Sequence, residues 1–198
     1  MAHAEADVGL RERKKAKTRA AIRHEALRLF REQGYDATTV EQIAEAAEVS
    51  PSTFFRYFPT KEDVVLRDDY DDQMIEVFRS QPPELTPMQA FRATIRETLG
   101  LLGPKERAEE GQRWAMARSV PTLRAAILDE LLRTLRVIAD LIAERVGRAP
   151  EDPAVRAFAG ALIGVVMSTM LECAGEDGLP DVDTIDAALA VLEAGLPL

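Results

Sequence analysis

The chain has 198 residues, of which 46% are hydrophobic and 30% are charged, and this balance excludes an intrinsically disordered protein. Its single cysteine excludes an internal disulfide framework and a cysteine-cluster zinc site, and its two histidines argue against a histidine metal site or catalytic triad. The N-terminus lacks the apolar core of a secretory signal. The longest uncharged stretch, 157–171, is shorter than the ~18 residues of a membrane span. We therefore expect a cytoplasmic protein without a membrane partner, and we expect no cofactor.

The net charge of −9 conceals an uneven distribution of charge along the chain. Residues 11–31 contain nine lysines and arginines and two acidic residues, whereas residues 68–198 carry a net charge of −10. A basic head followed by an acidic body indicates two different tasks in one chain. The basic head fits a nucleic-acid partner, and the alternative is a solvated basic helix face.

Residues that start and stop helices divide the head into short segments. Gly34 would end the first helix, and Thr39 with Gln42, or Thr38 with Glu41, would cap the N-terminus of the second. Ser50 would cap the third helix, with Pro51 at its first position, and Thr60 would cap the fourth. These positions predict helices at about 11–33, 40–47, 51–58 and 61–79.

The body continues the helical pattern, with prolines and glycines between segments rather than inside them. The predicted helices cover about 87–102, 105–118, 122–146, 154–174 and 182–194. We therefore predict an all-α chain with a head at 11–65 and a body at 66–198. The helix at 61–79 would join the two parts rigidly and allow motion of the body to reach the head.

Residues 39–58, TVEQIAEAAEVSPSTFFRYF, contain two short helices joined by a turn of about three residues. The small side chains of Ala44, Ala47 and Val49 allow these helices to cross closely. This is the arrangement of a helix-turn-helix motif, in which the second helix enters the major groove of DNA.

A longer run, TRAAIRHEALRLFREQGYDATTVEQIAEAAEVSPSTFFRYFPTKEDVV, resembles the N-terminal domain of the TetR family of bacterial repressors. The resemblance implies an all-α protein in which an N-terminal three-helix helix-turn-helix domain is fused to a helical-bundle ligand-binding and dimerisation domain. The stretch FFRYFPTKEDVVL, followed by the acidic run DDYDD, further resembles regulators of the mycofactocin-system type, which implies an acyl-CoA-like ligand.

Five candidate DNA-binding residues lie at the start of the second helix of the motif or on it. Ser50, Ser52 and Thr53 carry hydroxyls that can reach phosphates or base edges. Phe55 could press against a thymine methyl group or stack along a sugar, and Arg56 could read the groove or pair with a phosphate.

The resemblance adds three candidates, Thr39, Tyr57 and Lys61, at positions that contact the DNA backbone in the family. The sequence departs from the common family pattern at two positions, with Ser52 in place of a frequent glycine and Phe55 in place of a frequent tyrosine. Loss of the tyrosine hydroxyl removes one possible phosphate hydrogen bond, so the family's contacts cannot be transferred as a complete set.

Two further features of the head concern its core and its N-terminal end. Phe54 and Phe58 are expected to be core residues rather than DNA contacts. The basic stretch 11–19 is a further candidate for contact with a DNA groove or with phosphates.

The last two helices are the predicted dimer interface, because a palindromic operator requires a two-fold protein. Small residues at intervals of three and four let the helix at 154–174 approach a neighbour closely, and the last helix adds apolar positions. The candidates are Ala157, Gly160, Ala161, Gly164, Ser168, Ile185, Leu189 and Leu192. The alternative is that the helix at 154–174 is the centre of a monomeric bundle.

Aromatic, methionine and aliphatic side chains on the middle helices are candidates for a ligand pocket, and core packing is the alternative for each. They are Phe78, Phe91, Ile95, Leu99, Trp114, Met116, Met167, Met170 and Cys173. Arg113, Arg118 and Arg124 could meet an anionic ligand or form a solvated helix face.

These observations predict a ligand-responsive TetR-type regulator, a repressor or an activator, that binds palindromic double-stranded DNA as a homodimer. A hydrophobic or acyl-CoA-like effector is expected to control binding. The alternative is an architectural DNA-binding protein that tolerates any sequence. An enzyme is not expected, because neighbouring acidic pairs point in different directions on a helix and no nucleophile–histidine pair is apparent.

Overall fold

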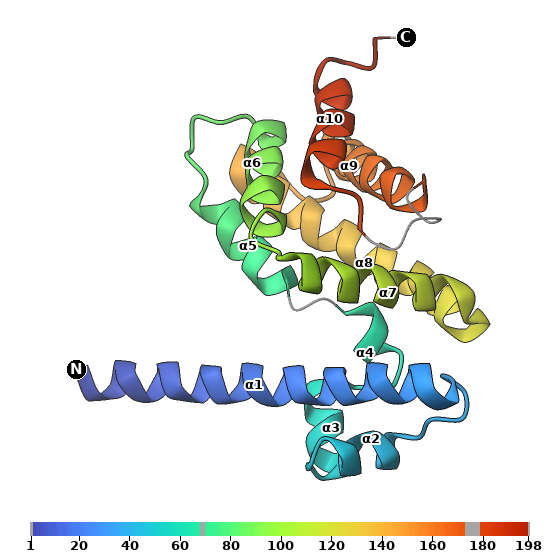
Figure 1. The fold of residues 1–198 in the computed structure, drawn as a ribbon. Coiled ribbons are helices and arrows are strands. Elements are labelled where there is room, and N and C mark those ends of the chain that lie inside the picture. Colours follow the sequence, from blue (N-terminus) through green and yellow to red (C-terminus); the bar gives the residue numbers. More distant parts are fainter. Residues whose placement is uncertain (1, 68–69, 173–178, 198) are drawn as a thin grey trace. The chain divides into compact units, whose positions relative to one another are not determined.

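A computed structural model describes residues 2–67, 70–172 and 179–197, and every regular element in these ranges is an α-helix (Figure 1). The helices are α1 Ala2–Gln33, α2 Val40–Ala46, α3 Pro51–Tyr57, α4 Asp63–Leu66, α5 Tyr70–Ser80, α6 Pro87–Leu99, α7 Pro104–Ser119, α8 Pro121–Val146, α9 Pro153–Glu172 and α10 Val182–Glu193. The predicted all-α fold is confirmed. The chain divides into two compact units, Met1–Leu66 and Arg67–Leu198.

The first unit is built by α1 packing against α2 and α4, and by α2 packing against α3. Its core consists of fully or almost fully buried apolar side chains from all four helices, namely Ile22, Ala26, Phe30, Ile43, Ala44, Phe54, Phe58, Val64 and Val65. Burial of this apolar stripe holds helices as short as α2 and α3, which would be marginal as isolated peptides.

The predicted capping residues hold the ends of these short helices. The Gln42 amide N–H donates to Thr39 Oγ1 at 3.2 Å, and the Thr39 N–H donates to Gln42 Oε1 at 2.9 Å, so the capping box before α2 is formed in both directions. Gly34 has a φ of 90°, the left-handed conformation that commonly follows a helix.

The predicted single helix over 61–79 is instead two helices, because Arg67, between α4 and α5, is not helical. The sequence beside Arg67 contains four aspartates within residues 68–72, and aspartate is a weak helix former whose like charges repel at short spacings. Thr60 does cap the turn that leads into α4, since its Oγ1 accepts the Asp63 N–H at 3.2 Å. The expectation that one rigid helix joins head and body is therefore wrong.

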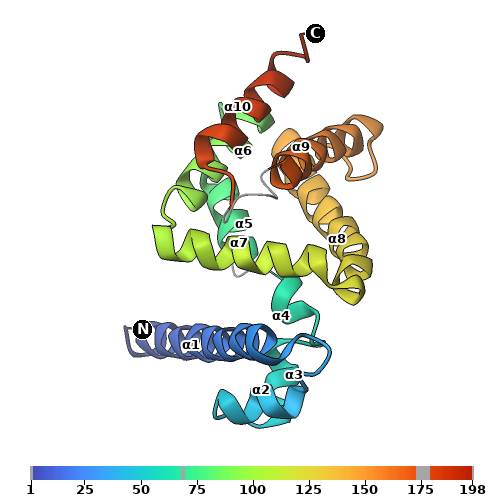
Figure 2. The ribbon, with the colours of Figure 1, turned by 45° about the vertical axis from the view of Figure 1, so that its right-hand side comes forward.

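The second unit packs α6 against α5 and α10, and α9 against α8 and α10. Figure 2 shows α8 running from the end of α7 to the loop before α9. The core contributed by these helices includes Phe78, Phe91, Ile95, Ile142, Leu162, Ile185 and Leu189. Gly147 ends α8 in a left-handed conformation with a φ of 66°, as its position before the loop predicts.

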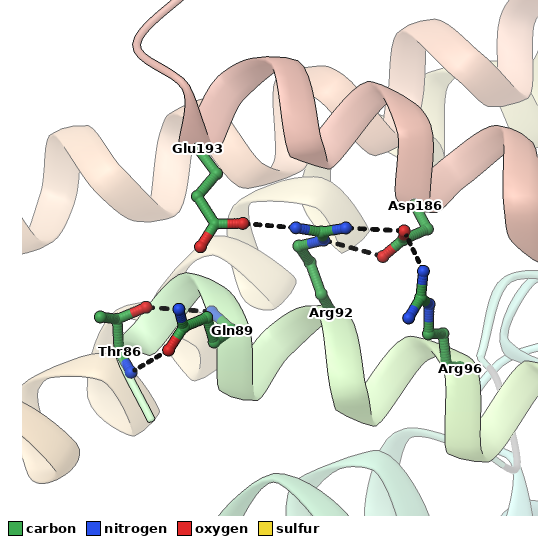
Figure 3. A network of polar contacts seen from close by, with 6 residues as sticks. All are labelled: Thr86, Gln89, Arg92, Arg96, Asp186 and Glu193. Atoms are coloured by element: carbon green, nitrogen blue, oxygen red, sulfur yellow. Dashed lines mark hydrogen bonds and ion pairs between the residues drawn. The ribbon is translucent and has the colours of Figure 1, made fainter. Parts of the chain in front are cut away.

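An ionic network joins α6 to α10 inside the second unit (Figure 3). Arg92 donates two hydrogen bonds to the carboxylate of the nearly buried Asp186, from Nε to Oδ1 and from Nη2 to Oδ2, both at 2.8 Å. Arg96 donates to the same Oδ2 at 2.6 Å, and Arg92 also pairs with Glu193. The Arg92 guanidinium lowers the pKa of Asp186, and the two carboxylates raise the pKa of Arg92.

One helix in the described ranges, α9, is long and apolar enough to cross a membrane by length and composition, over Pro153–Leu171. Only 22% of this window is buried inside the chain. Core helices of soluble proteins have the same length and composition, so one such helix is weak evidence for a membrane span.

Acidification is expected to weaken the second unit through Asp186. The pKa of Asp186 is lower in the folded chain than the unfolded value of about 3.9. The contribution of its carboxylate to the free energy of unfolding is therefore complete above pH 3.9 and is lost as the pH falls through the folded pKa. Asp186→Asn should cost about 2 kcal/mol at pH 7 and flatten the loss below pH 4, as measured by urea unfolding. An Asn variant as stable as the parent at pH 7 would show that the network contributes nothing.

Candidate nucleic-acid interface

The orientation of α3 is set by two phenylalanines that the unit buries completely. Phe54 and Phe58 are both 0% exposed, and their ring centroids lie 5.9 Å apart. Their expected role as core residues is confirmed. Because they are one turn apart on the inner side, the positions Ser52, Phe55 and Arg56 share the outer side and are exposed.

Three hydroxyls gather at the start of α3. Ser50 is the N-cap residue, and its Oγ accepts the Thr53 N–H at 3.1 Å. The same Oγ lies 2.8 Å from Ser52 Oγ and 2.9 Å from Thr53 Oγ1. Hydroxyls can donate and accept, so this cluster can exchange its internal hydrogen bonds for contacts with phosphates or base edges.

The outer side of α3 adds an exposed aromatic ring and a guanidinium. Phe55 is 49% exposed, although it contacts Phe54 edge-on at a centroid distance of 5.5 Å. The Arg56 guanidinium lies 5.3 Å from the centroid of the half-buried Tyr57 ring. The site therefore combines an exposed apolar surface, a cation and hydroxyls on a helix of seven residues and its N-cap.

Lys61 has a structural role that no local sequence pattern predicts. Its Nζ donates to the carbonyl oxygens of Tyr35 at 2.9 Å and of Thr38 at 3.0 Å, and lies 4.1 Å from the Tyr35 ring centroid. An ammonium group has three N–H donors, so one remains for a phosphate. Burial, with the nearby Glu62 carboxylate, raises the pKa of Tyr35 and keeps that ring neutral.

A glutamine pair also ties the end of α1 to the start of α2. Gln33 Nε2 donates to Gln42 Oε1 at 2.9 Å and to Thr38 Oγ1 at 3.1 Å. Because Gln42 Oε1 also accepts the Thr39 N–H, the exposed Thr39 is held in place from two sides. The spacing of Thr39 and Gln42 predicted the capping box, but no local sequence pattern predicted the hydrogen bonds of Gln33.

The turn between α2 and α3 contains a residue in a strained conformation. Glu48 has a φ of 54°, a left-handed value that costs a non-glycine residue about 1 kcal/mol or more. Hydrogen bonds hold it on both sides, from Glu48 N–H to Glu45 O at 3.1 Å and from Val49 N–H to Ala44 O at 2.9 Å. The turn between the two helices of the motif is thus held by backbone hydrogen bonds to the end of α2.

The candidate ligand-binding residues of the body divide into buried and half-buried side chains. Phe78, Phe91 and Ile95 are buried in the core cluster of the second unit. Leu99 and Met170 pack against that cluster, and Trp114, Met116 and Met167 are half-buried. Cys173 lies outside the described residues.

The three candidate arginines differ in their surroundings. Arg113 is only 3% exposed, and its Nε donates to Glu110 Oε2 at 2.7 Å, whereas Arg124 is exposed. Arg118 Nη1 donates to the Met170 carbonyl oxygen at 3.3 Å, which links α7 to the end of α9. A solvated helix face therefore describes Arg124 and is wrong for Arg113, because Glu110 compensates its buried charge.

The dimer candidates also separate by exposure. Ala157, Gly160, Gly164 and Ser168 form an exposed stripe along α9, which Leu171 continues. Ala161 and Leu192 are half-buried. Ile185 and Leu189 are both 0% exposed, so these two belong to the core of their own chain. On α10 the exposed apolar side chains are instead Ala187 and Val191.

A helix-turn-helix unit with an exposed polar and aromatic second helix, followed by a helical unit, defines a DNA-binding protein of the helix-turn-helix class. Residues 22–67 match the family model for bacterial regulatory proteins of the tetR family, and residues 85–197 match the MftR C-terminal domain. The chain belongs to the TetR family of transcriptional regulators and is not an enzyme.

Individual relatives agree with this assignment. The transcriptional regulator TcmR of Streptomyces glaucescens is 39% identical over 151 residues, covering 73% of this chain and 67% of TcmR. MftR of Mycobacterium tuberculosis, a putative mycofactocin biosynthesis regulator, is 24% identical over 93% of both chains. The structure of Thermus thermophilus FadR, a TetR family repressor in complex with lauroyl-CoA, is 26% identical with a TM-score of 0.51, covering 91% of this chain and 95% of FadR.

Replacing Lys61 is expected to reduce stability as well as DNA affinity. Lys61→Met keeps most of the aliphatic stem but removes both carbonyl hydrogen bonds, which should cost about 1–3 kcal/mol in urea unfolding of the first unit. Tyr57→Phe is the control, and should change stability by less than about 0.5 kcal/mol. Unchanged stability of Lys61→Met would assign this lysine to DNA contact alone.

Proposed function

We propose that this regulator is a repressor that binds a palindromic operator as a homodimer and is released by a hydrophobic, acyl-CoA-like effector. The observation that carries the proposal is the outer side of α3, where Ser52, Phe55 and Arg56 are exposed while Phe54 and Phe58 anchor the helix from inside. A short helix held by its core with a mixed polar and aromatic outer side fits the major groove.

The contacts divide into those that read bases and those that position the protein. Ser52 and Thr53, at the start of α3, are assigned to base edges, with Phe55 against a thymine methyl group and Arg56 in the groove. Thr39, Ser50, Tyr57 and Lys61 are assigned to the phosphate backbone. Phosphate contacts fix the register of the helix, and base contacts supply the sequence preference.

The homodimer is supported by the apolar surface that a single chain leaves open. On α9 the exposed stripe from Ala157 to Leu171 runs the length of the helix, and α10 packs beside it with Ala187 and Val191 exposed. Two copies related by a two-fold axis would cover both helices in a four-helix interface. The same contact would explain why α9 is apolar and yet mostly open in one chain.

Two glycines on α9 strengthen this interpretation. A Cβ atom placed on Gly160 or Gly164 would meet nothing within 4 Å in its own chain. Glycine inside a helix costs about 1 kcal/mol relative to alanine, so each glycine carries a cost that its own chain does not explain. Close approach of a partner helix, which a side chain would block, accounts for both positions.

The effector is inferred from relatives and from the composition of the second unit. The body matches the MftR C-terminal domain over 85–197, and the FadR of Thermus thermophilus is bound to lauroyl-CoA. Half-buried Trp114, Met116 and Met167 offer adaptable apolar contacts for an acyl chain. Such an effector releases DNA only to the extent that it prefers the conformation that does not bind the operator.

Selection from a random duplex library at about 150 mM salt tests the DNA proposal. We expect a two-fold-symmetric consensus with half-sites about 34 Å apart. Thr53→Ala and Ser52→Ala should change the preferred bases, whereas Tyr57→Phe should weaken all sequences alike. Lauroyl-CoA should lower operator affinity and free CoA should not. Absence of any consensus, with and without lauroyl-CoA, would favour a sequence-tolerant architectural protein.

Gly164→Leu tests the homodimer. A Cβ atom at this exposed position meets nothing within 4 Å in the single chain, whereas a leucine there should block close approach of α9 to its partner. The mass in solution should therefore fall from about twice the chain's 21.9 kDa to that value. Operator affinity should fall about 100-fold or more with the loss of the second half-site. Ala108→Leu, on the exposed surface of α7, is the matched control and should remain dimeric. A dimeric Gly164→Leu variant would move the interface elsewhere.

A further inference from the structure

Phe55 is set apart from the other aromatic side chains of the first unit by its exposure. Among residues 14–67, whose burial the structure describes, it is the one large apolar side chain on the surface, and it is 49% exposed. Phe30, Phe54 and Phe58 are buried, and Tyr57 is half-buried. A single exposed apolar side chain is common on proteins, so the meaning of this one depends on where it lies.

The ring of Phe55 lies on the outer side of α3, among groups suited to DNA. Ser52 precedes it by three positions, about one helical turn, and Arg56 follows it directly, and both are exposed. The planes of the Phe54 and Phe55 rings stand at 87° with their centroids 5.5 Å apart, and Phe54 is completely buried. This edge-to-face contact restrains the Phe55 ring while about half of its surface stays open.

A phenyl ring can recognise only one kind of feature on a base pair. It has no hydrogen-bond donor or acceptor, so the polar edges that distinguish base pairs in the major groove cannot bind it through hydrogen bonds. The contact that remains is apolar, and the apolar group in the major groove is the methyl group at C5 of thymine. The proposed contact of Phe55 is therefore a contact with a methyl group rather than with a particular base.

This distinction matters for cytosine, which can carry a methyl group at the same ring atom. In the major groove thymine presents the acceptor O4 and cytosine the amino donor N4, and methylation at C5 leaves that amino group unchanged. A ring without donors or acceptors cannot tell O4 from N4 by hydrogen bonding. It should therefore bind thymine and 5-methylcytosine alike, and both better than uracil and cytosine, which lack the methyl group.

We propose that Phe55 makes operator binding sensitive to methylation of cytosine at C5. This inference rests on the proposed DNA-binding function and goes beyond it, because it adds a chemical modification of DNA to the signals that the regulator detects. Ser52 and Arg56, on the same side of α3, carry the hydrogen-bonding groups that suit polar base edges and phosphates. The methyl group is thus recognised by a side chain that contributes no polar contact of its own.

The first test is a parallel selection from two random duplex pools, one of ordinary DNA and one in which 5-methylcytosine replaces every cytosine. From the ordinary pool we expect thymine at one position of each half-site. From the methylated pool the same position should accept cytosine as well as thymine, because both then carry the methyl group.

Affinities for single duplexes then give the size of the effect. Thymine, uracil, cytosine and 5-methylcytosine are compared at that position in both half-sites, with the rest of the operator unchanged. Burial of one methyl group changes affinity about 4-fold, so two half-sites should give about 15-fold tighter binding of 5-methylcytosine than of cytosine. Thymine should exceed uracil by the same factor, since each comparison changes only the methyl group.

Variants of α3 connect the effect to this ring. Phe55→Ala should bring both ratios to within about 2-fold of one, and should bind the uracil operator within about 3-fold of the parent, which shows that the variant is folded. Phe55→Tyr keeps an aromatic ring and should retain both ratios. Ser52→Ala, on the same exposed side, is the matched control, and should leave the ratio of 5-methylcytosine to cytosine as in the parent.

Three outcomes would overturn the inference. The first is a parent ratio of 5-methylcytosine to cytosine below about 2-fold, or weaker binding of the methylated duplex. The second is a parent-like ratio in Phe55→Ala, because another side chain would then recognise the methyl group. The third is the absence of a consensus from both pools, which contradicts the proposed function as well. A clear consensus without a methyl preference contradicts this inference alone.

Discussion

Burial of two aromatic rings is the constraint on which the proposed DNA-binding surface depends. A helix of seven residues such as α3 has too few hydrogen bonds to persist alone, and Phe54 and Phe58 fix both its existence and its rotation. Cavity formation on truncating a buried phenylalanine costs about 3–5 kcal/mol, a large share of the stability of a small unit. The outer residues are therefore presented by a core that has no contact with DNA.

The first unit was predictable because its signals are local. Each of three helix starts is predicted within four residues, by Thr39 with Gln42, by Ser50 with Pro51, and by Thr60. All three caps are present. The hydroxyl cluster follows from that capping chemistry. The two carbonyl oxygens that hold Lys61 come from residues 23 and 26 positions away, and no spacing rule in the chain links them.

The helices of the second unit were predictable from the sequence, but the burial of their individual side chains was less so. Apolar periodicity identifies an apolar stripe without saying whether the same chain or a second copy covers it. Ile185 and Leu189 are covered by their own chain, while Gly160 and Gly164 on α9 are not. Arg113 is buried, and Glu110, one turn earlier on the same helix, compensates its charge; charge counts alone cannot distinguish this pair from a solvated face.

The ionic network between α6 and α10 has a thermodynamic consequence for regulation. Arg92 and Arg96, which hold Asp186 of α10, directly follow Phe91 and Ile95 of the core along α6. If the proposed effector displaced those core side chains, the arginines would move with them, and so would a helix of the proposed homodimer interface. Linkage is reciprocal, so the apparent affinity for the effector would then vary with the concentration of the chain, and dilution itself would act as a regulatory input.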